Sequence, residues 1–181
     1  MQDNEEIVKP MTLFSTVYDR FLDLVTEELY LYWTKEEILE DAKSYLMTAI
    51  FNFEYPKVNI RDFDKDYQDY ENHTTGRFNV ELGFDEIEML ANLMGIAWVE
   101  RQLRDSSLTK MVYTGNDAKS AGVNNQVNAL NKLLDILNAK MKVLKFNYGT
   151  RDFDKDGTPI PWKPSLSGKK TNRERRNGRL R

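Results

Sequence analysis

The sequence contains no cysteine and a single histidine, His73, among its 181 residues. Without cysteine the chain has no disulfide, thiolate metal site, iron–sulfur cluster or cysteine nucleophile. With one histidine it builds no multi-histidine zinc site by itself, and at most one imidazole is left for a catalytic triad. A P-loop, a Gly-rich dinucleotide turn and a His–Glu metal pattern are missing as well. These absences predict a protein that is not an enzyme and holds no cofactor.

Long apolar runs are also missing. No stretch of about 18 apolar residues is available to cross a bilayer, and the first residues lack the charged, apolar and small-residue order of a secretory signal. We therefore expect a soluble protein inside a cell, without a membrane partner. Hydrophobic residues make up 40% of the chain, which is enough to bury one sizeable core, so we expect one domain with tails.

Charge is distributed unevenly along the chain, although the net charge is only −3. Residues 1–80 carry 17 acidic and 8 basic side chains, and residues 81–168 carry 11 of each. Residues 169–181 carry seven basic side chains and one acidic one. An acidic first half and a basic end favour contacts between oppositely charged surfaces of copies or partners.

Apolar residues three and four positions apart predict a first amphipathic helix over about 12–29. Thr34 and Glu37 form a capping-box pattern, which predicts that a second helix begins there. Its apolar stripe extends to Phe53, and helical character is expected to stop near Pro56. Because few residues separate the two helices, we expect an antiparallel or steeply crossed pair.

A β-hairpin is predicted after Pro56. Two short β-prone runs, Lys57–Phe63 and Arg77–Leu82, flank a polar stretch that is rich in aspartate and glutamate. We expect these runs to be the strands and the acidic stretch to be a long, mobile tip.

Two further helices are predicted before Gly115. Asp85, with Glu88 at the capping-box position, predicts a helix to about Arg104. A short helix from Ser106 to Val112 is expected to follow.

The strongest periodic pattern comes next and predicts a long helix that ends at Gly149. Its apolar residues alternate spacings of four and three over more than three heptads: Val123, Val127, Leu130, Leu134, Leu137, Met141, Leu144 and Tyr148. Further apolar residues widen this face: Leu133, Ile136 and Val143. So broad a face has to be covered by other helices of the chain or by neighbouring copies. We predict oligomer packing through six of these residues: Val127, Leu130, Leu134, Leu137, Met141 and Leu144.

The sequence as a whole predicts a mainly α fold. We expect a bundle of four to five helices with a β-hairpin insertion at about 57–82 and an extended C-terminal tail. The expected organisation is an N-terminal arm over 1–10, a helical domain over 11–150, and a Pro-containing basic tail over 151–181.

The hexapeptide RDFDKD occurs twice, at residues 61–66 and 151–156. In the second copy Asp152, Asp154 and Asp156 precede a glycine, as in the first half of a calcium-binding loop. Lys163 stands where that loop needs a bidentate glutamate, and prolines replace its exit helix. We expect a solvated aspartate-rich turn without a metal; a bound calcium or magnesium ion is the alternative.

The C-terminal tail is the candidate binding segment. Prolines favour an extended chain around Trp162, a large apolar anchor. The basic residues that follow are Lys169, Lys170, Arg173, Arg175, Arg176, Arg179 and Arg181. Three interpretations are open: docking on a protein, including a neighbouring copy; contact with nucleic-acid phosphates, which would be non-specific and salt-dependent; or a solvated tail with no partner.

Two stretches resemble small virion proteins of tailed bacteriophages that infect Gram-positive hosts, the head–tail connector, adaptor or neck proteins. They are MTLFSTVYDRFLDLVTEELYLYWTKEEI and DEIEMLANLMGIAWVERQLRDSSLTKMVYTGNDAKSAGVNNQVNALNKLLDILNAKM, and the resemblance covers about residues 11–150. It rests on overall pattern and transfers no catalytic residue.

The resemblance implies a mostly helical subunit of the virion neck that is made in the host cytoplasm. Such subunits assemble into a ring, commonly of about twelve copies, below the portal protein. The ring continues the DNA channel to the tail and contacts passing genomic DNA without reading its sequence. Portal protein and tail or neck proteins are the implied partners. The alternative function is a nucleic-acid-binding regulatory protein that uses the basic C-terminal tail.

Overall fold

The computed structural model describes residues 11–25, 33–71, 74–112, 117–150, 152–153 and 159–160. The chain divides into two compact units, residues 1–146 and 147–181. In the described part of the second unit, strands β4 (Asp152–Phe153) and β5 (Pro159–Ile160) pair in antiparallel fashion.

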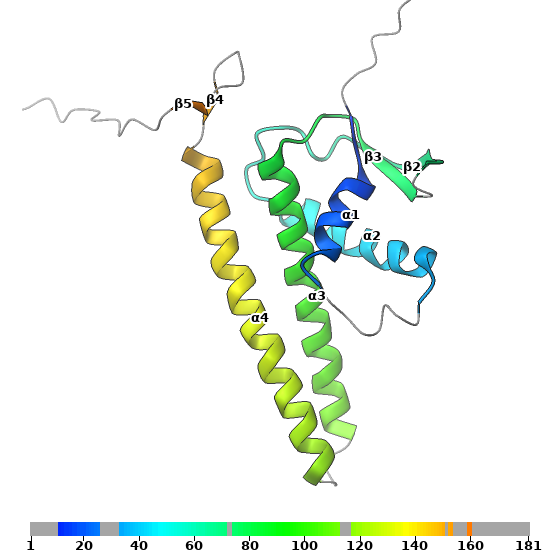
Figure 1. Ribbon diagram of the computed structural model, residues 1–181, viewed down its shortest axis with the longest axis vertical. Helices are drawn as coiled ribbons and strands as arrows, with labels where there is room; N and C mark the ends of the chain where they lie inside the picture. Colours follow the sequence, from blue (N-terminus) through cyan, green and yellow to red (C-terminus); the bar gives the residue numbers. More distant parts are fainter. Residues whose placement is uncertain are drawn as a thin grey trace, which may run out of the picture. The chain divides into compact units, whose positions relative to one another are not determined.

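The fold is mainly α-helical, as the sequence predicts, with a small antiparallel sheet (Figure 1). The described residues form four helices: α1 (Phe14–Leu22), α2 (Lys35–Asn52), α3 (Phe84–Val112) and α4 (Asp117–Thr150). The sheet has the order β1-β3-β2 and consists of β1 (Thr12–Leu13), β2 (Phe63–Asp69) and β3 (Thr74–Phe78).

Helix α1 is shorter than the predicted helix over 12–29. Its N-terminal side is a strand, because Thr12 and Leu13 pair with Phe78 and Arg77 of β3. The Thr12 hydroxyl also accepts a hydrogen bond from the backbone N–H of Leu82, at 2.8 Å. These contacts come from residues far along the chain, so the helical spacing of the apolar residues does not reveal them. Residues 26–29 of the predicted helix lie outside the described residues.

The capping box of α2 is confirmed. The backbone N–H of Glu37 donates to the Thr34 hydroxyl at 3.3 Å, and the backbone N–H of Thr34 donates to the Glu37 carboxylate at 2.8 Å. Helix α2 ends at Asn52, four residues before Pro56, near which the sequence predicts that helical character stops. This start signal is local, which is why the sequence reveals it.

The hairpin exists, but the predicted strands are wrong. The acidic run is itself strand β2, and Asp64 lies opposite Arg77 of β3. The Arg77 guanidinium also lies over the Tyr67 ring, 4.2 Å from its centroid. Opposite charges and an aromatic–cation contact across the strands compensate the low β-propensity of aspartate.

Helices α3 and α4 each continue past a predicted end. The expected break between Arg104 and Ser106 is absent, because no proline or glycine interrupts α3 there. Helix α3 begins at Phe84, so Asp85 lies inside its first turn instead of capping it. Helix α4 contains Gly149 and ends at Thr150.

Phe14 is the centre of the packing between α1 and the sheet. Its ring is fully buried and lies 4.8 Å from that of Phe78 and 6.0 Å from that of Phe63, measured between centroids. Gly76 of β3 has a φ of +102°, and a Cβ at this position would overlap the Phe14 ring. Gly76 is therefore required for both its backbone conformation and its lack of a side chain.

We expect Gly76→Ala to lower the free energy of unfolding by about 3 kcal/mol, because it adds backbone strain and overlap with Phe14. Gly122→Ala is the control, since Gly122 is exposed in α4 and a Cβ there meets nothing within 4 Å. It should raise the free energy of unfolding by about 0.5–1 kcal/mol. Chemical denaturation of both variants measures the difference, and equal effects would contradict the packing described.

Candidate functional site

Glu88 of α3 is a buried carboxylate that joins three helices. Its side chain is only 6% exposed. Arg20 of α1 donates a hydrogen bond from Nε to Glu88 Oε1, and Lys140 Nζ of α4 lies 3.2 Å from Glu88 Oε2. One carboxylate thus binds a cation from each of two neighbouring helices and fixes which side of α4 faces α3.

The two cations keep Glu88 ionised. Burial alone would raise the pKa of Glu88, but the hydrogen bonds and charges of Arg20 and Lys140 outweigh burial and lower this pKa below its ordinary value. The hydrogen bond to Glu88 and its charge raise the pKa of Arg20. The sequence predicts Glu88 as a capping residue, and this prediction is wrong because the partners of the carboxylate lie 68 and 52 positions away.

The contact of α3 with α4 continues at Asn92 and Gly95. The buried Asn92 side chain donates from Nδ2 to the backbone carbonyl of Leu137, at 2.9 Å. A Cβ at Gly95 would lie 3.3 Å from Leu137 Cδ1, so the small residue permits close packing. Asn92 Oδ1 has no hydrogen-bond partner among the described residues. Together with Glu88, these residues set the register of the two helices.

The six residues predicted for oligomer packing fall into two groups. Leu130, Leu137 and Met141 are buried inside the chain. The other three are half-buried: Val127, Leu134 and Leu144. Part of the heptad face therefore packs within the subunit, and part remains accessible.

A second apolar row lies on α4 beside the buried face. Ala129, Ile136 and Val143 are seven residues apart and exposed, and the side chains of Ile136 and Val143 are 64% and 59% accessible. At about 100° per residue, Ile136 and Val143 point about 100–120° away from Leu137. Among the described residues, the broad apolar face predicted from the sequence is thus only partly covered.

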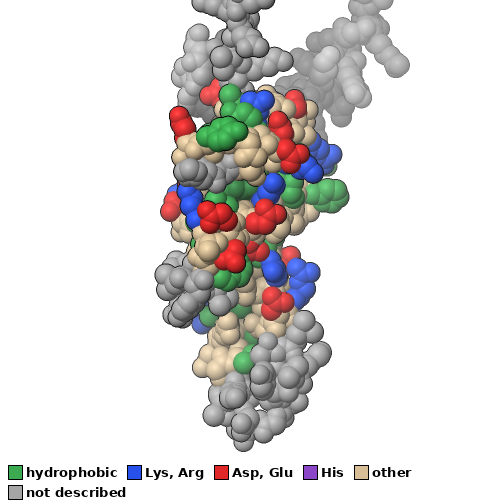
Figure 2. Space-filling model, turned by 90° about the vertical axis from the view of Figure 1, so that its right-hand side faces the viewer, with side chains coloured by type: hydrophobic (Ala, Val, Ile, Leu, Met, Phe, Trp, Pro, Cys, Tyr) green, Lys and Arg blue, Asp and Glu red, His purple; other side chains and the backbone are tan. Residues whose placement is uncertain are grey.

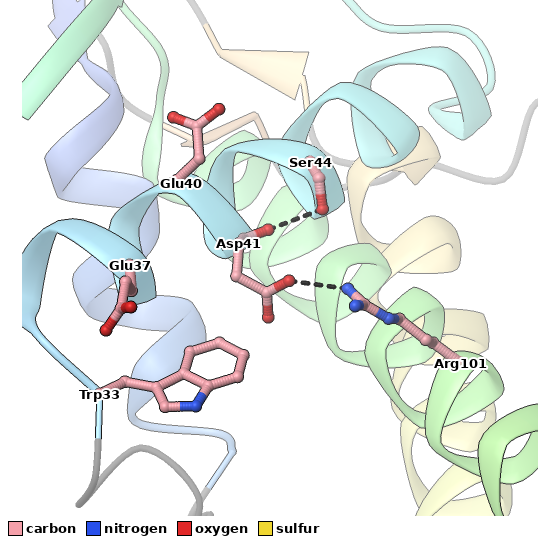
Figure 3. Close-up of a pocket in the computed structure, with 6 residues that line it drawn as sticks. All are labelled: Trp33, Glu37, Glu40, Asp41, Ser44 and Arg101. Atoms are coloured by element: carbon pink, nitrogen blue, oxygen red, sulfur yellow. Dashed lines mark hydrogen bonds and ion pairs between the residues drawn. The ribbon is translucent and has the colours of Figure 1, made fainter.

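An open pocket of about 500 Å³ lies where α2 meets α3. Its lining combines an indole, three carboxylates, a hydroxyl and a guanidinium (Figure 3): Trp33, Glu37, Glu40, Asp41, Ser44 and Arg101. Figure 2 shows that, among the described residues of one face, acidic side chains gather with Lys and Arg between them.

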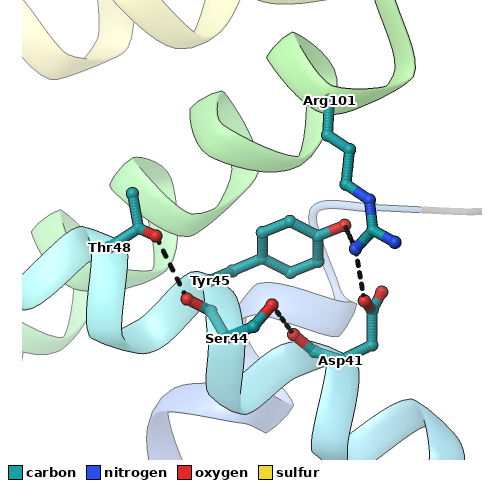
Figure 4. A network of polar contacts seen from close by, with 5 residues as sticks. All are labelled: Asp41, Ser44, Tyr45, Thr48 and Arg101. Carbon is teal, nitrogen blue, oxygen red and sulfur yellow. Dashed lines mark hydrogen bonds and ion pairs between the residues drawn. The ribbon is translucent and has the colours of Figure 1, made fainter. Parts of the chain in front are cut away.

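Arg101 of α3 is held at one side of this pocket. Its Nη1 lies 2.7 Å from Asp41 Oδ1 and donates to the Tyr45 hydroxyl at 3.0 Å (Figure 4). Burial, and then the charge of Asp41, raise the pKa of Tyr45 to about 12. The Tyr45 hydroxyl therefore stays neutral at physiological pH and accepts the hydrogen bond from Arg101.

The predicted binding segment lies outside the described residues, with Trp162 and all seven basic residues of 169–181. The same holds for His73, Asp154 and Asp156, whereas Asp152 lies in β4. No group of three or more potential metal ligands occurs among the described residues. In the same part of the chain, no helix is long and apolar enough to cross a membrane.

The sequence does not point to Glu88 or to the pocket as sites. Glu37, Asp41 and Ser44 follow helical spacing along one side of α2, which is a detectable signal, and Trp33 lies just before the N-cap of that helix. Arg101 is 60 positions from Asp41, and its contribution becomes visible only in the structure.

Comparison with protein-family models, curated protein sequences and solved structures finds no match to this chain.

We expect Glu88→Gln to lower the free energy of unfolding by about 2 kcal/mol near pH 7. This is less than for a fully buried pair, because the Arg20 and Lys140 side chains are 40% and 34% exposed. Since the pKa of Glu88 is lowered in the folded chain, its contribution is present above the ordinary glutamate pKa and disappears as pH falls through the lowered value.

The difference between wild type and Glu88→Gln should therefore shrink as the pH falls from about 7 to about 3. Glu100→Gln, at an exposed position of the same helix, is the control and should change stability little. Urea denaturation across this pH range checks the prediction. A constant difference between wild type and Glu88→Gln would contradict the role given to the ionised carboxylate.

Proposed function

We propose that this chain is a structural assembly protein, the subunit of a head–tail connector ring in a tailed bacteriophage. In this proposal copies pack side by side below the portal protein and continue the DNA channel to the tail or neck proteins. The subunit acts by shape and contact in the virion, and passing genomic DNA is not bound by sequence.

The observation that supports self-association is the exposed apolar row on α4. Complete burial of a Val or Ile side chain stabilises by about 1.5–3 kcal/mol, and Ile136 and Val143 each keep more than half of their surface accessible. If a helix or sheet of a neighbouring copy covers this row, burial of these side chains stabilises the assembly by part of that free energy. Because Lys140 is held by Glu88, the row keeps a fixed direction relative to α3.

The more specific assignment to a phage neck is supported by the resemblance of residues 11–150 to connector proteins. A subunit with a partly uncovered long helix suits a closed ring, where each copy completes the next. The uneven charge, acidic in residues 1–80 and basic in 169–181, suits head-to-tail contacts between different surfaces of adjacent copies.

We expect the double substitution Ile136→Lys and Val143→Lys to abolish assembly without unfolding the subunit, because both positions are exposed. The matched control is Asn131→Lys with Asn138→Lys, which adds equal charge at two exposed positions of α4 with the same spacing. Light scattering measures the masses. The first variant should have the mass of one chain, 21.3 kDa, and the control should match the wild-type oligomer. Equal masses for both variants would contradict the proposal.

Ring formation and DNA binding separate the connector from the nucleic-acid-binding alternative. The connector predicts closed rings with a central channel in negative-stain images of the full-length protein, and little retardation of duplex DNA in a gel at about 50 mM salt. A monomer that retards DNA strongly at low salt, and loses this binding as salt rises, would favour the regulatory protein and contradict the connector.

A further inference from the structure

We propose that the pocket at Trp33 binds arginine side chains of the basic C-terminal segment, residues 169–181. This inference deepens the proposed function and rests on it, because it requires that in the proposed assembly the segment of one copy reaches the pocket of another. The binding site for the basic segment is thus the Trp33 pocket of another copy of this chain.

The pocket already binds the guanidinium of Arg101, through the same kinds of contact that a second guanidinium would need. Arg101 pairs with the Asp41 carboxylate at 2.7 Å, and its Cζ lies 5.8 Å from the centroid of the Tyr45 ring. A carboxylate and an aromatic ring are the two groups that recognise a planar guanidinium, by charge-assisted hydrogen bonds and by stacking. This internal arginine shows that the surface accommodates that cation.

The open side of the same pocket offers a second set of these groups. The Trp33 side chain is 39% exposed. Figure 3 shows its indole on the side of α2 that carries Glu37 and Asp41, whereas Glu40 extends from the opposite side of the helix. Within the described residues, both hydrogen bonds from Thr34 to the Glu37 carboxylate go to Oε2, so Oε1 is left for an incoming donor. Three carboxylates face one guanidinium in the lining, so an incoming cation meets net negative charge.

The basic segment has the matching chemistry. It carries five arginines and two lysines against one glutamate within 13 residues, which concentrates guanidinium groups on a short stretch. Arginine suits this pocket better than lysine, because its flat group stacks on an indole and binds a carboxylate through two N–H groups at once. The volume of about 500 Å³ is in the range of pockets that enclose small ligands, and so has room for an arginine side chain.

The test uses full-length protein in which the seven basic residues of 169–181 are changed to glutamine, so that the pocket has no competing segment. The protein is labelled with 5-fluorotryptophan, and Trp33→Phe assigns the Trp33 fluorine signal among the three tryptophans. A synthetic peptide of residues 165–181 is then added. We expect the Trp33 signal to shift with saturation. No shift at Trp33 overturns the inference.

Matched variants show whether the recognition is specific. Glu37→Gln, which keeps a side-chain oxygen for the Thr34 cap, should weaken peptide binding by about tenfold through loss of a charge-assisted contact, whereas Glu36→Gln, an exposed control outside the pocket lining, should leave it unchanged. A peptide with all five arginines replaced by lysine should bind several-fold more weakly. Equal loss for both glutamine variants, or equal binding of the lysine peptide, overturns the guanidinium pocket.

The results distinguish a wrong pocket inference from a wrong proposed function. If the Trp33 signal ignores the peptide while light scattering still gives the wild-type oligomer, the pocket inference is wrong and the proposed function stands. If the wild-type protein is monomeric while the peptide binds at Trp33 of the glutamine variant, the pocket is supported and the proposed assembly is wrong.

Discussion

The arrangement of the long helices depends on the ion pairs that Glu88 forms with Arg20 and Lys140. A carboxylate buried to 6% exposure is unfavourable unless its charge is compensated. Arg20 and Lys140 provide that compensation from α1 and α4. Because the two cations come from different helices, the same contact that neutralises Glu88 also aligns both helices on α3. Asn92 and Gly95 extend this alignment along α3 by contact with Leu137.

The direction of α4 decides what the subunit presents to its surroundings. With Lys140 turned to Glu88 and Leu137 and Met141 buried, Ile136 and Val143 remain accessible. The proposed assembly depends on this division, since one apolar side of α4 stabilises the subunit and the adjacent side is left for another copy. The Trp33 pocket, between α2 and α3, adds a separate and more polar contact for the basic segment. The proposed apolar contact on α4 and the proposed charged contact at the Trp33 pocket thus lie on different surfaces of the subunit.

The features that were predicted correctly depend on neighbours in sequence. The Thr34–Glu37 capping box and the heptads of α4 are local, and the mainly helical fold follows from them. The errors come from distant partners. The acidic run forms strand β2 because Asp64 and Tyr67 meet Arg77, and Glu88 is an ion-pair residue because of Arg20 and Lys140. For the same reason the Trp33 pocket was not predicted, since Arg101 completes it from another helix.

The central claim is that a neighbouring copy covers Ile136 and Val143. It is tested most directly by cysteine labelling, because the chain contains no cysteine. A single cysteine in place of Ile136, and in separate proteins in place of Val143, Asn131 and Asn138, provides a unique thiol for labelling by a maleimide. The account predicts that assembly slows labelling at 136 and 143 by more than about tenfold and leaves 131 and 138 unaffected, because contact with a neighbour excludes the reagent. Equal labelling rates at all four positions in the assembled protein would contradict it.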